Sequence, residues 1–366
     1  MTKKKAIVKI TKKIVKKVIV KKPVEKETLR KPAAKTFLIK KSVVKLLAKH
    51  PTLKSTREGF GEAILELGKN NKNVVVLCAD LTESVRTSEF AKVYSERFFQ
   101  CGVAEANMVG MAAGLALEGK IPFVTSFGSF VPNRCLDHIR QSVCYNQANV
   151  KFASTHCGLV TGEDGATHQP LEDMAIMRAL PGMTVLVPAD FNETKKATLA
   201  AAKMHGPVYI RLTRPGTEMI TSERSEFKLG KLSVLKEGKD LVIISCGPIL
   251  EHVMLAAKEL EKRKIKVKVI NCHTLKPIDA EGLVAIARET GAVLTVEDHQ
   301  AYGGLGGAVA EVLGQRIFVP LEILGVKNSF GESGKPLELL KKHGLNSISI
   351  AAAAEKLLKR KQGLLP

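Results

Sequence analysis

Short apolar runs alternate with amphipathic stretches from Pro51 onward. Ser55 and Glu58 form a capping-box pattern that opens a helix, and its apolar residues recur on one face: Phe60, Ile64 and Leu67. Further helices are predicted at Ala104–Glu118 and Arg134–Asn146. Buried strands are predicted at four runs: Asn73–Ala79, Ile121–Ser126, Lys151–Thr155 and Thr184–Val187. This alternation is typical of a parallel α/β sheet.

A second α/β pattern begins after the polar stretch Thr221–Lys228. It contains the helix Pro248–Arg263 and four strands: Leu241–Ser245, Val267–Ile270, Ala292–Val296 and Leu321–Leu324. The sequence therefore predicts the α/β fold class, with two doubly wound domains at residues 51–228 and 229–366 after a basic tail at residues 1–50. Such sheets bind ligands at the carboxyl ends of their strands, so functional residues are expected there.

The composition is that of a globular protein, with 45% apolar and 25% charged residues among 366. No apolar run approaches the roughly 18 residues of a membrane-spanning helix, so no membrane contact is expected. The seven cysteines include no C-x-x-C pair, and their odd number favours reduced thiols. We therefore expect a cytoplasmic protein.

The net charge of +21 is concentrated in residues 1–50. This segment holds 17 lysines and Arg30 against Glu25 and Glu27, so it carries +16 and the rest of the chain carries only +5. Between Lys3 and Lys22 too little apolar surface is present to offset chain entropy. The pattern favours a disordered, solvated Lys-rich tail over an arm that contacts nucleic acid or an acidic partner.

A dense polar cluster follows the predicted strand Lys151–Thr155. The segment His156–Pro170 reads HCGLVTGEDGATHQP, which places two histidines and two carboxylates on a glycine-rich loop at the expected ligand edge. The spacing matches no zinc pattern and no cysteine pair accompanies it, so no metal site is predicted. The two histidines together favour a catalytic role for this loop.

The order and spacing of several motifs resemble transketolase. These motifs are Cys101–Met108, Pro122–Phe130, Asp137–Arg140 and Gly162–Gln169, with Glu172 and Asp173. The resemblance extends over residues 53 to 345, approximately. It implies the pyrimidine-binding and C-terminal domains of an enzyme that uses thiamine diphosphate to move a two-carbon ketol unit from a ketose phosphate to an aldose phosphate.

One part of the transketolase pattern is missing. Transketolases also have a diphosphate-binding domain, where a G-D-G motif and a downstream Asn hold Mg²⁺ and the diphosphate, and this sequence contains no G-D-G. The resemblance therefore implies the C-terminal subunit of a split transketolase. Its cofactors would be thiamine diphosphate and Mg²⁺, with the metal held by a separate N-terminal subunit in an α2β2 assembly. Alone, the chain is expected to be inactive.

The resemblance assigns four residues to the cofactor. Glu105 matches the family's catalytic glutamate: a carboxyl group at the start of an apolar helix can stay protonated through desolvation and hydrogen-bond a pyrimidine ring nitrogen. Phe127 and Phe130 match aromatics that stack on the aminopyrimidine, a place that core packing would also explain. A third aromatic of some relatives corresponds to Asn133. Asp80 matches a carboxylate near the cofactor at the subunit contact.

Six residues are assigned to the substrate by the same resemblance. Three match positions that contact the sugar's hydroxyls and carbonyl: His156, Asp164 and His168. A neutral or a protonated imidazole can donate to the developing alkoxide, and the histidines are expected to exchange protons near pH 7. Three match positions that hold the substrate phosphate, to which guanidinium groups can bind bidentately: Arg57, Ser84 and Arg214.

Three alternatives remain open. The β subunit of a 2-oxo acid dehydrogenase first component has the same two-domain layout, although the Gly-Glu-Asp-Gly-x-Thr-His-Gln loop argues against it. 1-Deoxyxylulose-5-phosphate synthase also requires a diphosphate domain, and its loop lacks the paired Glu-Asp. A scaffold or nucleic-acid-associated protein that kept the fold without the enzyme would explain the basic tail, but it would not explain the complete set of matching side chains.

Overall fold

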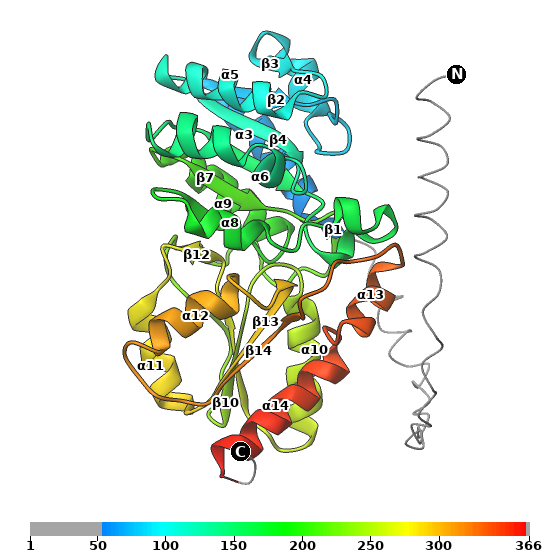
Figure 1. The fold of residues 1–366 in the computed structure, drawn as a ribbon, viewed down its shortest axis with the longest axis vertical. Coiled ribbons are helices and arrows are strands. Elements are labelled where there is room, and N and C mark those ends of the chain that lie inside the picture. Colours follow the sequence, from blue (N-terminus) through cyan, green and yellow to red (C-terminus); the bar gives the residue numbers. More distant parts are fainter. Residues whose placement is uncertain (1–52, 364–366) are drawn as a thin grey trace, which may run out of the picture. The chain divides into compact units, whose positions relative to one another are not determined.

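A computed structural model describes residues 53–363. The tail predicted at residues 1–50 lies outside this part of the chain. The described residues form two large, mainly parallel sheets with helices on both faces, together with a two-stranded antiparallel sheet, so the predicted fold class is confirmed. Figure 1 shows the first sheet with β2, β4 and β7 and the second with β10, β13 and β14.

The first sheet has seven strands. Their order is β12 (Thr274–Lys276), β6 (Thr184–Leu186), β7 (Val208–Arg211), β5 (Lys151–Thr155), β4 (Ile121–Phe127), β2 (Val74–Cys78) and β3 (Phe98–Gln100). All neighbours are parallel except β12, which runs antiparallel to β6. Four strands were expected from apolar runs, and all four are present.

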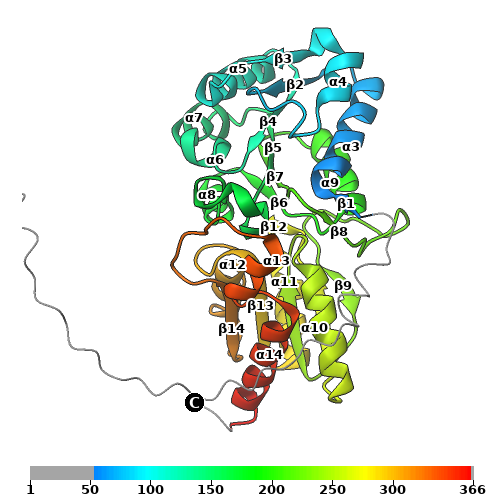
Figure 2. The same cartoon turned by 90° about the vertical axis from the view of Figure 1, so that its right-hand side faces the viewer.

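Alternate strand residues face opposite helical layers, as the two-residue period of a strand requires. Val74 and Val76 pack with α3 (Thr56–Asn70) and α9 (Phe191–Lys203), while Val75 and Leu77 pack with α5 (Glu105–Leu117). Figure 2 shows α3 and α9 on one side of this sheet and α5 on the other. The predicted capping box at the start of α3 is confirmed, because both reciprocal Ser55–Glu58 hydrogen bonds form.

The second sheet has five strands, all parallel except β9, in the order β14 (Leu321–Val326), β13 (Val293–Gln300), β10 (Leu241–Ser245), β11 (Val267–Asn271) and β9 (Ser233–Lys236). Helices α10 (Leu250–Lys262) and α14 (Ser347–Lys361) cover one face. Helices α11 (Ala280–Thr290) and α12 (Leu305–Leu313) cover the other. The short helix α13 (Pro336–Lys342) follows the segment after β14.

Two expectations about local structure were wrong or incomplete. The single helix predicted at Arg134–Asn146 is broken into α6 (Val131–Arg134), α7 (Leu136–His138) and a π-helical turn at Ile139–Cys144. Several short strands were not predicted: β1 (Lys54–Ser55), β3, β7, β8 (Gly216–Thr217), β9 and β12. All six have two to four residues, too few to display a clear alternating pattern.

Candidate active site

The predicted site residues gather where strands of the first sheet end. Asp80 follows β2, Phe127 ends β4, His156 directly follows β5, and Arg214 lies shortly after β7. These strands are parallel neighbours, so their carboxyl ends share one edge of the sheet. The chain therefore presents these side chains where ligands bind in folds of this kind.

Four predicted residues form one cluster of rings. The His156 ring stacks on Phe127, with centroids 3.8 Å apart and planes at 28°. Phe127 and Phe130 are stacked at 5.6 Å and 21°, and His168 meets Phe130 edge-on at 5.4 Å. Phe130 is only partly buried, so packing into the core does not account for its position by itself. The cluster offers a flat apolar surface beside two imidazoles.

Glu105 lies next to this cluster, at the first residue of α5. Its side chain is 2% exposed, and its Oε2 accepts a hydrogen bond from Arg134 Nη1 at 2.8 Å. Its Oε1 is buried and has no partner among the described residues. The Arg134 guanidinium also lies over the Phe130 ring, 4.6 Å from the centroid. One carboxyl oxygen of Glu105 is thus left without a partner in the described part of the chain, as buried polar atoms rarely are.

Arg134 was not identified from the sequence. It lies four residues after Phe130, and this helical spacing beside a predicted stacking residue is the signal that could have found it. Asn133, which stands where some relatives have a third aromatic, donates instead to Glu172 Oε1 at 2.7 Å. The side of the site formed by α6 is therefore polar.

His156 is held in one orientation. Its backbone has φ of 58°, and its Nδ1 lies 2.9 Å from Thr155 Oγ1. Burial, followed by the nearby charges of Arg57 and Arg214, lowers the pKa of His156 to about 3. The imidazole is therefore neutral near pH 7, and its Nε2 makes no hydrogen bond to the described part of the chain. Of the two protonation states considered from sequence, the structure favours the neutral one.

The glycine-rich loop pairs its carboxylates with Arg214. Arg214 Nη1 donates to Asp164 Oδ1 at 3.3 Å and to Thr161 O at 3.0 Å, and it lies 3.6 Å from Glu163 Oε2. His168 Nδ1 lies 2.9 Å from Thr167 Oγ1. Asp164 and Arg214, which were assigned separately to the sugar and its phosphate, therefore contact each other.

Arg57 and Ser84 are also brought together, but through the backbone. Arg57 Nη1 donates to the Ser84 carbonyl at 2.9 Å, and its Nε is buried without a partner among residues 53–363. Burial and the neighbouring Arg86 lower the pKa of Arg57. Arg86, which sequence reasoning missed, has φ of 64° and follows Ser84 by two residues. Three arginines near one imidazole suit an anionic ligand group.

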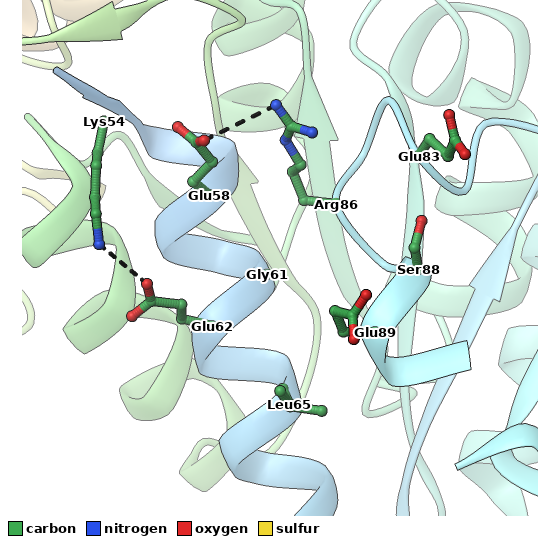
Figure 3. Close-up of a pocket in the computed structure, with 9 residues that line it drawn as sticks. All are labelled: Lys54, Glu58, Gly61, Glu62, Leu65, Glu83, Arg86, Ser88 and Glu89. Carbon is green, nitrogen blue, oxygen red and sulfur yellow. Dashed lines mark hydrogen bonds and ion pairs between the residues drawn. The ribbon is translucent and has the colours of Figure 1, made fainter. Parts of the chain in front are cut away.

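A cavity of about 460 Å³ lies between α3 and α4 (Ser88–Val93) and is drawn in Figure 3. Four glutamates line it, and none of the ten predicted site residues does. Its two cations are already paired, Lys54 with Glu62 at 3.2 Å and Arg86 with Glu58 at 3.9 Å. This cavity is therefore poorly suited to a phosphate group, and we do not place the substrate there.

Asp80 makes no hydrogen bond or ion pair with the ring cluster among residues 53–363. It is exposed, has φ of 57°, and its backbone N–H donates to Gln100 Oε1 at 2.7 Å. Among residues 53–363, no group of three or more His, Cys, Asp and Glu side chains is arranged to hold a metal ion.

Comparisons with known proteins identify the family of this chain. The transketolase pyrimidine-binding domain family matches residues 53–218, and the transketolase C-terminal domain family matches residues 230–350. The 6-deoxy-6-sulfo-D-fructose transketolase subunit SqwH of Clostridium sp. (strain MSTE9) is 42% identical over 83% of this chain and 95% of its own length. Human transketolase is 35% identical over 83% of this chain, which spans 49% of the human protein.

A solved structure titled "Split gene transketolase, inactive beta4 tetramer" is 47% identical, with a TM-score of 0.78, over 84% of this chain and 99% of that one. The chain belongs to the transketolase family. Within that family it corresponds to the pyrimidine-binding and C-terminal domains, as the motifs predicted. In the described residues, no helix is long and apolar enough to span a membrane.

Proposed function

We propose that this chain is the C-terminal subunit of a two-chain transketolase and acts on sugar phosphates with thiamine diphosphate. The observation that carries the proposal is Glu105: its Oε1 is buried and unpartnered among the described residues, and its Oε2 binds Arg134, whose guanidinium lies over the Phe130 ring. A buried carboxyl oxygen without a partner can share a proton with a ring nitrogen of the aminopyrimidine, which has only a lone pair to offer. Thiamine diphosphate, when bound, supplies the carbanion chemistry that breaks and forms the carbon–carbon bond of the ketol unit.

Each residue of the site has a distinct role in this proposal. Phe127 and Phe130 bind the aminopyrimidine face, and Glu105 holds or shares a proton at the ring nitrogen. The neutral His156 uses its free Nε2 to bind an oxygen of the sugar. His168 moves protons to and from the substrate, while Asp164 binds a sugar hydroxyl. Asp80 is assigned to the cofactor side of the subunit contact.

The anionic end of the sugar is proposed to bind at Arg57, Ser84 and Arg214. The buried, unpartnered Nε of Arg57 supports this placement, because such a donor gains a partner only when an acceptor enters. Arg214 would exchange its loop carboxylates for the phosphate or bind both. Arg86 adds a third positive charge close by.

The partner is proposed to be an N-terminal transketolase subunit with a G-D-G motif, which would hold Mg²⁺ and the diphosphate. An α2β2 assembly would then carry out the reaction in the pentose phosphate pathway. SqwH, which this chain matches over nearly its whole length, is described as a subunit, which supports a partner chain. All seven cysteines are free thiols, which fits the reducing cytoplasm.

Assembly and cofactor binding test this proposal. We expect the chain to bind thiamine diphosphate tightly only when an N-terminal transketolase subunit and Mg²⁺ are present, because the diphosphate contacts would come from that subunit. Size-exclusion chromatography would follow assembly, and calorimetric titration would follow cofactor binding. Equal affinity for thiamine diphosphate with and without the partner would contradict the division of the site between two chains.

Arg57→Ala is expected to raise KM for phosphorylated sugars by about 10- to 100-fold, because a hydrogen bond to a charged group contributes about 1.5–3 kcal/mol. KM for unphosphorylated sugars and kcat should change little, since the lost binding is uniform. Ser84→Ala should also raise KM for phosphorylated sugars, by a smaller factor. Arg224→Ala, at an exposed arginine, is the control. An equal rise in KM for phosphorylated and unphosphorylated sugars would contradict the assignment of Arg57 to phosphate binding.

A further inference from the structure

The catalytic loop, residues His156–Gln169, lies against the C-terminal domain. Three of its glycines have positive φ, at 86°, 78° and 79°, and all three face that domain. A Cβ at Gly158 would overlap the Asp298 carboxylate, one at Gly162 would meet Pro336 at 3.1 Å, and one at Gly165 would meet Ser333 Oγ at 2.5 Å. The loop backbone therefore approaches this domain more closely than a side chain would allow.

Asp298 binds the beginning of the loop. Its Oδ1 accepts the Leu159 N–H at 2.9 Å, and its Oδ2 lies 3.4 Å from the Val160 nitrogen. Asp298 is itself fixed, because it is buried in β13 and its carbonyl accepts from Arg211 Nη2 at 2.9 Å. Arg211 is in turn paired with the buried Asp173 at 2.7 Å. The first residues of the loop are thus bound to a carboxylate that has little freedom to move.

Gln169 binds the end of the loop to the same domain. Its Nε2 donates to the carbonyls of Gly162 and Glu332, each at 2.9 Å. Its Oε1 is buried without a partner among the described residues, so the amide acts here through its donors. Glu332 belongs to the segment Asn328–Lys335 between β14 and α13. One amide therefore joins two turns of the loop to the C-terminal domain.

We propose that the C-terminal domain positions the catalytic loop through two contacts, Asp298 to Leu159 and Gln169 to Glu332, which we call the loop clamp. The inference rests on the proposed function, because the clamp acts through His156, Asp164 and His168. These three residues lie beside or between the clamped points. Loss of the two contacts would let the loop move and would change the positions of these three side chains relative to one another. A displacement of about 1 Å can lower the rate about 100-fold.

Gln169→Glu tests the clamp with almost no change of shape. It removes both donors and places a carboxylate against two carbonyls. Gln300→Glu is the matched control. Gln300 Nε2 also donates to a carbonyl of the segment Asn328–Lys335, that of Ser329 at 2.7 Å, but among the described residues its side chain makes no hydrogen bond to the catalytic loop. Asp298→Asn is a second variant, which keeps the side-chain shape and loses one acceptor.

A glycine pair provides an independent test. Gly158→Ala places a methyl group against Asp298, whereas Gly182→Ala has the same conformational cost, at φ of 73°, with nothing within 4 Å. Hydrogen exchange measured on the full chain alone should become at least about tenfold faster in loop peptides of Gln169→Glu, Asp298→Asn and Gly158→Ala, since amide exchange reports local opening. Gln300→Glu and Gly182→Ala should exchange like the original chain.

In the complex with the partner subunit, kcat of the three clamp variants should fall by about tenfold or more, because the side chains of the loop would no longer be held in place. KM for phosphorylated sugars should rise by a smaller factor than kcat falls, because Arg57 and Ser84 lie outside the loop while Arg214 contacts it through Asp164. Unchanged loop exchange, equal acceleration in the two controls, or faster exchange with full kcat would overturn the clamp. Absence of turnover by the original chain with its partner would overturn the proposed function instead, and loop exchange in the isolated chain would still decide whether these contacts hold the loop.

Discussion

Glu105→Gln is expected to lower kcat by at least about 100-fold, the usual minimum contribution of a positioned proton-transfer group. Glu105 Oε1 is buried without a partner among the described residues, and its Oε2 is bound by Arg134. Glutamine fills the same space and can still accept from Arg134, so the chain should fold. Its amide cannot share a proton with a ring nitrogen, so activation of the cofactor should fail. Steady-state ketol transfer by the assembled enzyme measures the effect.

Glu118→Gln is the matched control for this variant. Glu118 caps the other end of helix α5 and is exposed, so the same substitution removes a carboxylate from the same helix without touching the ring cluster. Circular dichroism and assembly with the partner should be unchanged in both variants. Normal turnover by a correctly assembled Glu105→Gln enzyme would show that another group activates the cofactor.

His156→Asn is expected to lower kcat by about 100- to 1,000-fold, the usual loss when one donor to a developing oxyanion is removed. Asparagine tolerates the left-handed backbone at φ of 58°, so the substitution should not strain the loop. Its short amide can replace Nδ1 against Thr155 but cannot reach the position of Nε2. The loss should therefore fall on kcat with the fold intact.

The pH profile separates this role from acid–base catalysis by His156. Because its pKa is lowered to about 3, His156 stays neutral from pH 8 down to pH 5, and its ionisation should add no step to the kcat profile there. Any acidic limb seen in the original enzyme should remain in His156→Asn. A limb that disappears in this variant would show that His156 exchanges protons near neutral pH. His205→Asn, at an exposed histidine, is the control.

The sheets could be predicted because their central strands are buried on both faces. Runs such as Val74–Cys78 and Leu241–Ser245 are continuously apolar, and they stand out without any knowledge of tertiary contacts. Strand β12 has three residues, and its place in the first sheet depends on pairing with β6 across a long stretch of sequence. The break after α6 was not predictable in the same way, because no proline or glycine inside Arg134–Asn146 marks it.

The candidate site was predictable where motifs carry fixed spacing, as in Gly162–Gln169. The contacts between motifs were not predictable. The pairing of Arg134 with Glu105 joins residues 29 positions apart, and that of Asp298 with Leu159 joins residues 139 positions apart. No periodicity links such pairs, because they meet only after the sheets have formed. The neutral state of His156 similarly follows from burial and from arginines on three separate segments.

The most direct measurement is ketol transfer by the purified chain, by an N-terminal transketolase subunit, and by the two together. Each sample would contain thiamine diphosphate, Mg²⁺, a ketose phosphate donor and an aldose phosphate acceptor. We predict turnover only in the mixture, and its loss when Glu105→Gln replaces the original chain. Full turnover by the purified chain alone, or a mixture that assembles but transfers no ketol unit, would contradict the assignment of this chain as one half of a transketolase.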